Sequence, residues 1–199
     1  MELIQEVPDL SAYLAADSVI DHEHPLVRET SEQLSRMAPD AYAYARTAYE
    51  YVRDAIAHSF DSGDPRVTWR ASDVIEQRNG ICYAKSHALA ALLRAKSIPT
   101  ALCYQRLGDD DGSNHAVHGL VAVKLPGRGT WSRLDARGNK PGVDAQFSLV
   151  DERLAWSVRP ELGETDYPVL FAAPHPAVLN ALRAAPVRRH LERTLPAGL

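Results

Sequence analysis

The chain has 199 residues, 45% of them hydrophobic and 24% charged, a composition that fits one sizeable globular domain. Its 22 Lys and Arg residues are outnumbered by 26 Asp and Glu residues, and the formal net charge of −4 disfavours binding to nucleic acid. The N-terminal stretch MELIQEVPDL has no signal-peptide pattern, and no apolar run is as long as a membrane span, so we expect no contact with a membrane.

Helices are predicted in the first part of the chain. One is expected over residues 25–37, where it ends before a proline. A second is expected over 41–57, with Asp40 as its cap and apolar side chains along one stripe. Residues 58–66 contain a glycine and a proline, which indicate a loop.

A short helix and a longer one are predicted next. Asp73 and Glu76 have the spacing of a capping box for a short helix, which the Asn-Gly pair at 79–80 would end. From Cys82 to about Lys96 the pattern is again helical, and a Ser-Ile-Pro sequence then ends it. Alanines at helical spacing would let this helix pack closely against a sheet or another helix.

The hydrophobic period changes to two after this helix, which predicts strands over 100–107, 116–125 and 130–136. A short Pro-Gly link joins the last two strands, so we expect them to form an antiparallel hairpin. The following chain is irregular until two further expected helices, over 175–185 and from residue 187 onward. Helices that precede strands in this way predict the α+β class.

The two cysteines, Cys82 and Cys103, are fewer than a secreted disulfide scaffold carries. We therefore expect free thiols in a reducing cytoplasm, while a disulfide between them stays open as an alternative. Cys82 begins the predicted helix, where partial positive charge and free N–H groups favour a thiolate nucleophile and an oxyanion. The alternative interpretation is an inert buried thiol.

A nucleophilic cysteine needs a base, and His87 is the nearest histidine after Cys82. Five residues of helix place it about 140° around the axis, so His87 is predicted to point away from the thiol. Lys85 shares the side of Cys82 better and could add positive potential there. We therefore look for the base outside this helix.

His115 and His118 flank the start of the second predicted strand. With a turn centred on the Gly-Arg pair at 127–128, Asp135 lies on the same face as His118, roughly 7–8 Å away as a diagonal neighbour. The side chain of His115 then lies on the opposite face from Asp135. The pattern predicts that His118 takes the proton of the thiol while Asp135 orients and stabilises its imidazole.

Two segments carry side chains of the kinds that bind metals. The DHEHP stretch at 21–25 lacks the helical pairing of a zinc protease, and the acidic loop at 108–114 lacks the EF-hand positions. There is no CxxC pair and no Gly-rich phosphate loop either. We therefore expect no metal and no other cofactor.

The stretches NGICYAKSHALAALLRAKSIPTALCYQ and HGLVAVKLPGRGTWSRLDARGN together resemble the transglutaminase-like superfamily, a branch of papain-like thiol enzymes with the order Cys, His, Asp. The first carries a Gly-x-Cys entry and an Ile-Pro exit from the helix. The second carries a histidine that opens a strand, a Pro-Gly turn, and an aspartate that ends the next strand. The resemblance covers about residues 67–139.

The resemblance implies a papain-like α+β fold in a single domain over 1–199, with N-terminal helices, a core at about 67–139 and a C-terminal extension. Cys82 would be the nucleophile, His118 the base and Asp135 its orienting partner. The implied reaction is acyl transfer or hydrolysis at an amide of a peptide or protein substrate, through a thioacyl intermediate. Candidates for substrate binding or for the second oxyanion donor are Trp69, His58, Gln105 and Tyr83.

This sequence departs from the family pattern at three positions. Tyr83 stands where animal transglutaminases carry tryptophan, Leu120 where an aromatic residue is common, and Ala136 where proline is frequent. These departures keep open a non-catalytic module that binds peptides or proteins. A redox sensor that uses Cys82 and Cys103 is a third hypothesis. Neither the substrate nor the oligomeric state is indicated.

Overall fold

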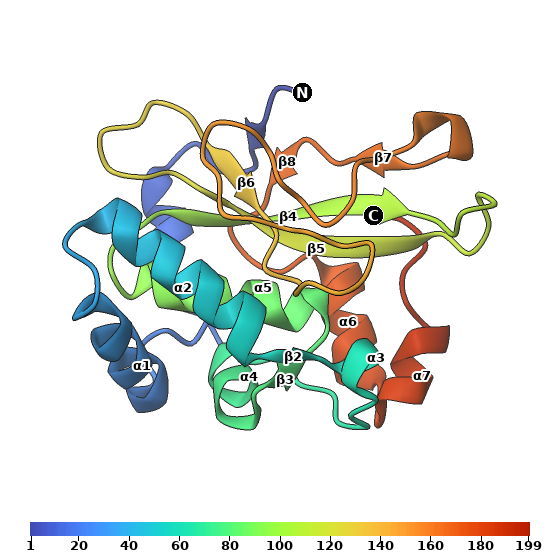
Figure 1. Cartoon of the computed structure of the whole chain (residues 1–199), viewed down its shortest axis with the longest axis horizontal. Helices are drawn as coiled ribbons and strands as arrows, with labels where there is room; N and C mark the ends of the chain where they lie inside the picture. Colours follow the sequence, from blue (N-terminus) through green and yellow to red (C-terminus); the bar gives the residue numbers. More distant parts are fainter.

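The computed structural model covers residues 1–199 and places an antiparallel sheet above a layer of helices in the view of Figure 1. The strand order is β6-β5-β4-β7. β4 (Thr100–Leu107) and β5 (Ala116–Val123) form the long central pair, flanked by β6 (Ser132–Leu134) and β7 (Thr165–Asp166). The three predicted strands are confirmed, although the second and third are shorter than expected.

The β5–β6 hairpin has the predicted register. Val121 pairs with Leu134, and the other pairs of the hairpin continue this alignment. Extended by the same rule, the register sets His118 opposite Arg137, just beyond the end of β6, with Asp135 on the same face. On its other side, His118 pairs with a residue of β4.

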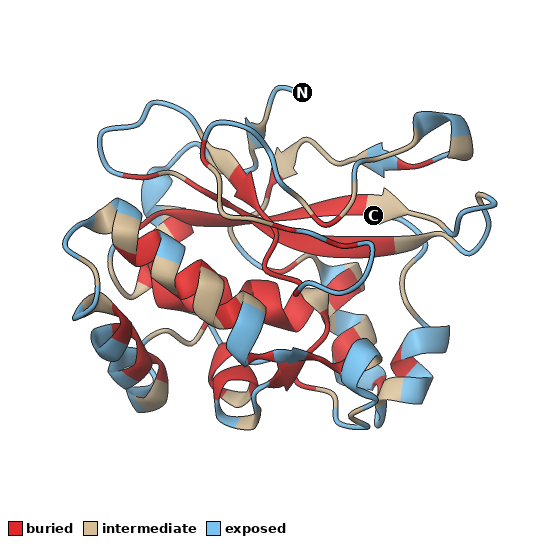
Figure 2. Cartoon of the chain, viewed as in Figure 1, coloured by how far each residue is buried: buried red, intermediate tan, exposed pale blue.

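The layer beneath the sheet includes the helices α1 (Pro25–Ser35), α2 (Ala41–Ala55), α4 (Ala71–Gln77) and α5 (Cys82–Arg94). α5 lies in the middle, packed against α2, α4 and the two central strands. Every residue of α5 after the first is buried, as its red colour in Figure 2 shows. The three longer predicted helices are therefore confirmed.

The capping box predicted at Asp73 and Glu76 is wrong. α4 begins at Ala71, and Asp73 lies within its first turn. The carboxylate of Asp21 instead accepts the backbone N–H of Ser72 across 3.0 Å and also accepts its hydroxyl. An acid that is distant in the sequence thus accepts a free N–H group at the start of α4. The spacing of residues within the helix does not reveal such a contact.

The loop predicted after α2 is partly structured. β2 (Ala57–His58) pairs in parallel with β3 (Asn79–Gly80), and α3 (Ser59–Ser62) follows β2 directly. This pairing aligns His58 with a glycine two residues before Cys82. Two segments that are far apart in the sequence therefore meet where α5 begins.

The main hydrophobic core lies between the helices and the sheet, and it draws buried side chains from Val19 through Leu191 (Figure 2). This shared core supports the expected single domain, which stays a prediction. No helix combines the length and the apolar composition that a membrane crossing requires. The remaining elements are β1 (Ile4–Gln5), η1 (Leu10–Leu14), η2 (Pro160–Leu162), β8 (Val169–Leu170), and the two predicted C-terminal helices, α6 (Pro176–Ala184) and α7 (Arg188–Arg193).

Candidate active site

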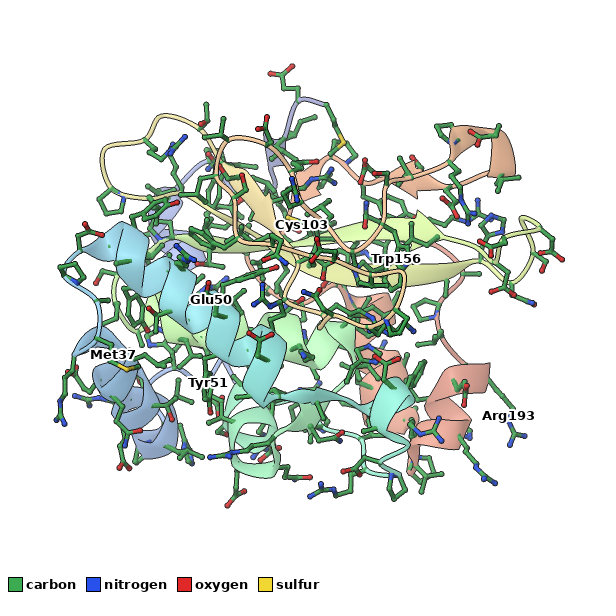
Figure 3. All side chains as sticks on the ribbon, in the orientation of Figure 1. Met37, Glu50, Tyr51, Cys103, Trp156 and Arg193 are labelled. Carbon is green, nitrogen blue, oxygen red and sulfur yellow. The ribbon has the colours of Figure 1, made fainter.

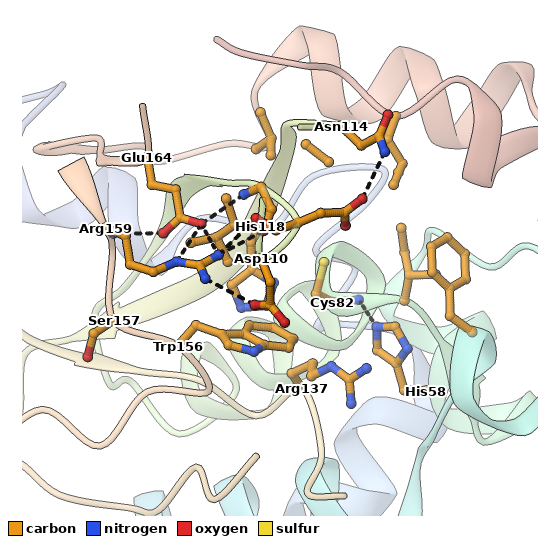
Figure 4. A pocket seen from close by; sticks show the side chains of 18 residues that line it. His58, Cys82, Asp110, Asn114, His118, Arg137, Trp156, Ser157, Arg159 and Glu164 are labelled. Atoms are coloured by element: carbon orange, nitrogen blue, oxygen red, sulfur yellow. Dashed lines mark hydrogen bonds and ion pairs between the residues drawn. The ribbon is translucent and has the colours of Figure 1, made fainter. Parts of the chain in front are cut away.

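A cleft with a volume of about 560 Å³ lies where α5 begins beside β5 (Figure 4). Both Cys82 and His118 line it. Its walls combine apolar side chains with charged ones, which suits a substrate that is partly apolar and partly polar. Other lining residues are His58, Phe60, Arg137, Trp156 and Arg159.

Cys82 is the first residue of α5, and its free, half-buried thiol faces the cleft. The residue before it, Ile81, is extended and provides no capping side chain. The partial positive charge of the helix N-terminus therefore lies beside the sulfur. The sequence prediction that α5 begins at Cys82 is confirmed.

His118 and Asp135 form a buried hydrogen-bonded pair, with Nε2 and Oδ2 separated by 2.8 Å. The carboxylate also accepts backbone N–H groups, from Arg137 at Oδ1 across 3.0 Å and from Ala155 at Oδ2 across 3.1 Å. These bonds fix its orientation. Because Nε2 is bound to Asp135, Nδ1 is the nitrogen left to interact with the thiol of Cys82. The contact between His118 and Asp135 follows from the predicted register.

The charges around His118 favour its protonated form. Burial alone would lower the pKa of His118, but its interactions with Asp135 and then with Cys82 raise it from 6.5 to about 10. Burial would raise the pKa of Asp135, yet the charge of His118 and the N–H groups of Ala155 and Arg137 hold it below 3.8. The site therefore stabilises an imidazolium beside the carboxylate of Asp135.

His58 approaches Cys82 from β2. The backbone N–H of Cys82 donates to Nε2 of His58 across 3.1 Å, so the ring carries its proton on Nδ1. That Nδ1 is buried without a hydrogen-bond partner, 3.8 Å from a carboxylate oxygen of Asp61. Burial, followed by the charge of Arg137, lowers the pKa of His58 well below 6.5. As placed, the ring of His58 lines the cleft as a neutral acceptor, and the substrate-binding or oxyanion role predicted for it stays a prediction.

The other three candidates for substrate or oxyanion binding do not line the cleft. Tyr83 is buried, and its hydroxyl donates to the carbonyl of Val117. Gln105 is buried on β4, where its amide donates to Asp166 across 2.9 Å. Trp69 stacks against two arginine side chains. The hydroxyl of Tyr83 and the amide N–H of Gln105 are thus engaged outside the cleft, and the role predicted for the three residues stays a prediction.

Three further residues, His87, His115 and Lys85, also lie outside the cleft lining. His87 is buried and bonds a backbone carbonyl, which confirms that it points away. His115 bonds another backbone carbonyl, in agreement with the choice of His118. Lys85 is buried and donates to carbonyls at the end of α2, and burial lowers its pKa to about 7. It therefore contributes less positive charge than expected.

Three residues at the site follow the predicted core and were not singled out by sequence reasoning. Ala155 donates to Asp135, and the ring of Trp156 packs against His118 with centroids 5.1 Å apart and planes at 87°. The guanidinium of Arg159 donates to the carbonyl of Gly108 and to the carboxylate of Glu164, and both of these residues line the cleft. The stretch that contains them has no periodic hydrophobic pattern. The isolated tryptophan is therefore the one feature of the sequence that could have indicated a role at the site.

The two segments weighed as metal sites serve local structure. Asp21 caps α4, and His24 accepts a backbone N–H at the start of α1. In the acidic loop, Asp109 accepts from an asparagine amide and Asp111 from a serine. No group of three or more His, Cys, Asp or Glu side chains is arranged to hold a metal ion.

The sequence model of the transglutaminase-like superfamily matches residues 28–136. A proposed cysteine protease from Cytophaga hutchinsonii has a similar structure, with a TM-score of 0.55, 18% identity, and coverage of 66% of this chain and 43% of that one. The periplasmic domain of TgpA from Pseudomonas aeruginosa gives a TM-score of 0.49, 20% identity, and coverage of 64% and 47%.

Red sea bream transglutaminase gives a TM-score of 0.47, 14% identity, and coverage of 66% of this chain and 32% of that one. The chain thus spans less than half the length of each of these structures. No curated protein matches the sequence. The likeness to the Cytophaga hutchinsonii structure shows the fold, and it confirms the predicted papain-like α+β class.

Proposed function

The chain belongs to the transglutaminase-like superfamily, and we propose that it is a thiol enzyme that transfers or hydrolyses acyl groups at amide bonds. Members of this superfamily generally perform thiol acyl transfer or proteolysis with Cys, His and Asp. One observation carries the proposal for this chain. The buried pair of His118 and Asp135 opens on the same cleft as the thiol of Cys82, at the start of a helix.

In the proposed acylation step, Sγ of Cys82 attacks the carbonyl carbon of an amide, and the carbonyl oxygen becomes an oxyanion. The carbon–nitrogen bond then breaks, and His118 gives its proton to the leaving amine. The products of this step are a free amine and a thioester on Cys82. Asp135 keeps the imidazolium oriented throughout, because its carboxylate is fixed by two backbone N–H groups.

In the proposed deacylation step, water or a second amine attacks the thioester carbonyl, and His118 accepts the proton of the attacking group. The carbon–sulfur bond breaks, and Cys82 leaves as a thiolate beside the imidazolium. Whether the product is an acid or a new amide depends on which acceptor reaches the thioester. The proposed substrate class is a peptide or protein amide, and the location in the cytoplasm stays a prediction.

A reactive ester tests the chemistry without knowledge of the natural substrate. With p-nitrophenyl acetate we expect a burst of nitrophenol equal to the enzyme concentration and an acetyl group mapped to Cys82. Cys82→Ala should abolish the burst, and His118→Ala should slow it about 100-fold or more. Cys103→Ala is the matched control, because its thiol is fully buried on β4. A burst unchanged in His118→Ala would contradict the proposal.

A second candidate function is a non-catalytic module that binds peptides or proteins. The observation that favours it is the bond from the Cys82 N–H to His58, which occupies a donor that acylation would use. This module would bind peptides in the cleft but never form a thioester. Stable peptide binding to wild-type protein, without any acylation by esters or amides, would therefore select it.

The third hypothesis, a redox sensor built on two thiols, gains little from the fold. Both cysteines are free, and Cys103 lies fully buried within the sheet (Figure 3). Burial raises the pKa of the Cys103 thiol strongly, which keeps it in the unreactive protonated form. Mass spectrometry after mild oxidation tests this hypothesis directly, because it requires a disulfide between Cys82 and Cys103.

A further inference from the structure

The segment 153–159, which we call the Trp156 segment, follows the region matched by the family and crosses the site. It is tied down in two places. The backbone N–H of Ala155 donates to the carboxylate of Asp135, and the carbonyl of Arg153 accepts a backbone N–H 2.9 Å away. Figure 3 shows Trp156 over the sheet, and Figure 4 shows it at the wall of the cleft.

The indole of Trp156 contacts two cationic side chains. It packs against the ring of His118, with centroids 5.1 Å apart. The guanidinium carbon of Arg137 lies over the indole, 5.2 Å from the ring centroid. Arg137 is itself fixed by two hydrogen bonds to Asp61. The position of the indole is therefore determined by its neighbours and not only by its own backbone.

We propose that Trp156 is a positioning residue, which keeps the ring of His118 turned toward Cys82 and keeps water away from the hydrogen bond to Asp135. The inference rests on the proposed function. Two physical effects support it. An indole packed edge-to-face against an imidazole restricts the rotamers of that ring. Exclusion of water strengthens the interaction between an imidazolium and a carboxylate.

The charged and titratable groups around His118 come from several elements. Cys82 belongs to α5 and His58 to β2, whereas Asp135 and Arg137 follow β6. Trp156 contributes no charge to this set. Its removal would therefore act through solvent access and ring orientation, while every charged partner of His118 stays in place.

Alkylation of Cys82 by iodoacetamide at pH 7 gives the first test. We expect Trp156→Ala to lower the rate about 10-fold, because His118 no longer holds the thiolate in place. Trp156→Phe restores an aromatic face and should stay within about threefold of wild type. Trp131→Ala is the matched control, since Trp131 packs on Tyr13 with the same 5.1 Å centroid distance, away from the cleft.

Fluorescence gives a second readout, which reports whether protonated His118 contacts the indole of Trp156 in solution. The chain has three tryptophans, so replacing the other two by phenylalanine leaves Trp156 as the sole emitter. A protonated imidazole quenches an indole in contact with it. At pH 7, His118→Gln should therefore raise the emission of the Trp156-only protein about twofold, and it should leave a Trp131-only protein unchanged.

The outcomes separate this inference from the proposed function. If Cys82 is alkylated at the same rate in the wild-type protein and in His118→Ala, the proposed function itself is refuted. Dependence on His118 together with a normal rate in folded Trp156→Ala would refute only the role of Trp156. An equal loss in Trp131→Ala, or no recovery in Trp156→Phe, would also overturn it, because the effect would then be one of general stability.

Discussion

Gly119 and Tyr83 are in direct contact, and a Cβ atom at Gly119 would lie only 2.7 Å from Cδ1 of Tyr83. Tyr83 follows Cys82 in the chain, and Gly119 follows His118. On the other side of His118, the carbonyl of Val117 accepts the hydroxyl of Tyr83. α5 and β5 are therefore held together on both sides of the proposed catalytic pair, and the absence of a side chain at Gly119 permits this approach.

Gly119→Ala is expected to separate α5 from β5 and to lower the alkylation rate of Cys82 at pH 7. A displacement of about 1 Å between reacting groups can cost about 100-fold in rate, so a loss of at least 10-fold is expected. Gly129→Ala is the matched control, because a Cβ at Gly129 meets no atom within 4 Å. A folded Gly119→Ala protein with normal reactivity would show that this contact does not set the geometry of the site.

Much of the proposed triad follows from local patterns in the sequence. The Pro-Gly turn and the period-two strands fix the register of the β5–β6 hairpin, and this register brings Asp135 to the face of His118. The Gly-x-Cys entry and the apolar helical pattern place Cys82 at the start of α5. Each of these features depends on residues that are close in the sequence.

The features that sequence reasoning missed depend on distant contacts. Asp21 caps α4 from across the chain, and His58 reaches Cys82 only because β2 and β3 pair. Trp156 meets His118 through a stretch without regular structure. Such contacts leave no hydrophobic periodicity in the sequence. Secondary-structure propensity does not show which loop covers which face of the sheet. Gln105 and Tyr83 lie outside the cleft lining for a related reason, since the sequence around each residue does not show where a cleft opens.

Asp135→Asn is expected to lower the pKa of His118. The charge of Asp135 helps to raise this pKa to about 10, and a neutral amide removes that contribution. His118 donates a proton only while it is protonated, so the variant should lose its acid form at a lower pH than wild type. NMR titration of histidine Cε1–H resonances, with His118 assigned by His118→Gln, measures both midpoints. Asp151→Asn is the exposed control, and equal midpoints would refute the charge effect.

The stability of the protein is expected to fall in mild acid because of His87. Burial lowers its pKa from 6.5 to about 4, so between these values the unfolded chain binds more protons than the folded one. Stability is therefore lost as pH falls, by about 2–3 kcal/mol from pH 7 to pH 4.5. Urea unfolding at both pH values should show a smaller loss in His87→Gln. The exposed control His190→Gln should behave as wild type.

His58→Ala is expected to speed acylation of Cys82 while alkylation stays within about twofold. The neutral His58 ring accepts the Cys82 N–H, and a substrate oxyanion must break that bond before it can use the same donor. A hydrogen bond of this kind contributes about 0.5–1.5 kcal/mol, so its removal should raise the rate about 2- to 10-fold. The nitrophenol burst measures acylation and iodoacetamide measures alkylation, with His115→Ala as control because His115 does not line the cleft. Slower acylation with normal alkylation would instead make His58 a donor to the oxyanion, after a change of its tautomer.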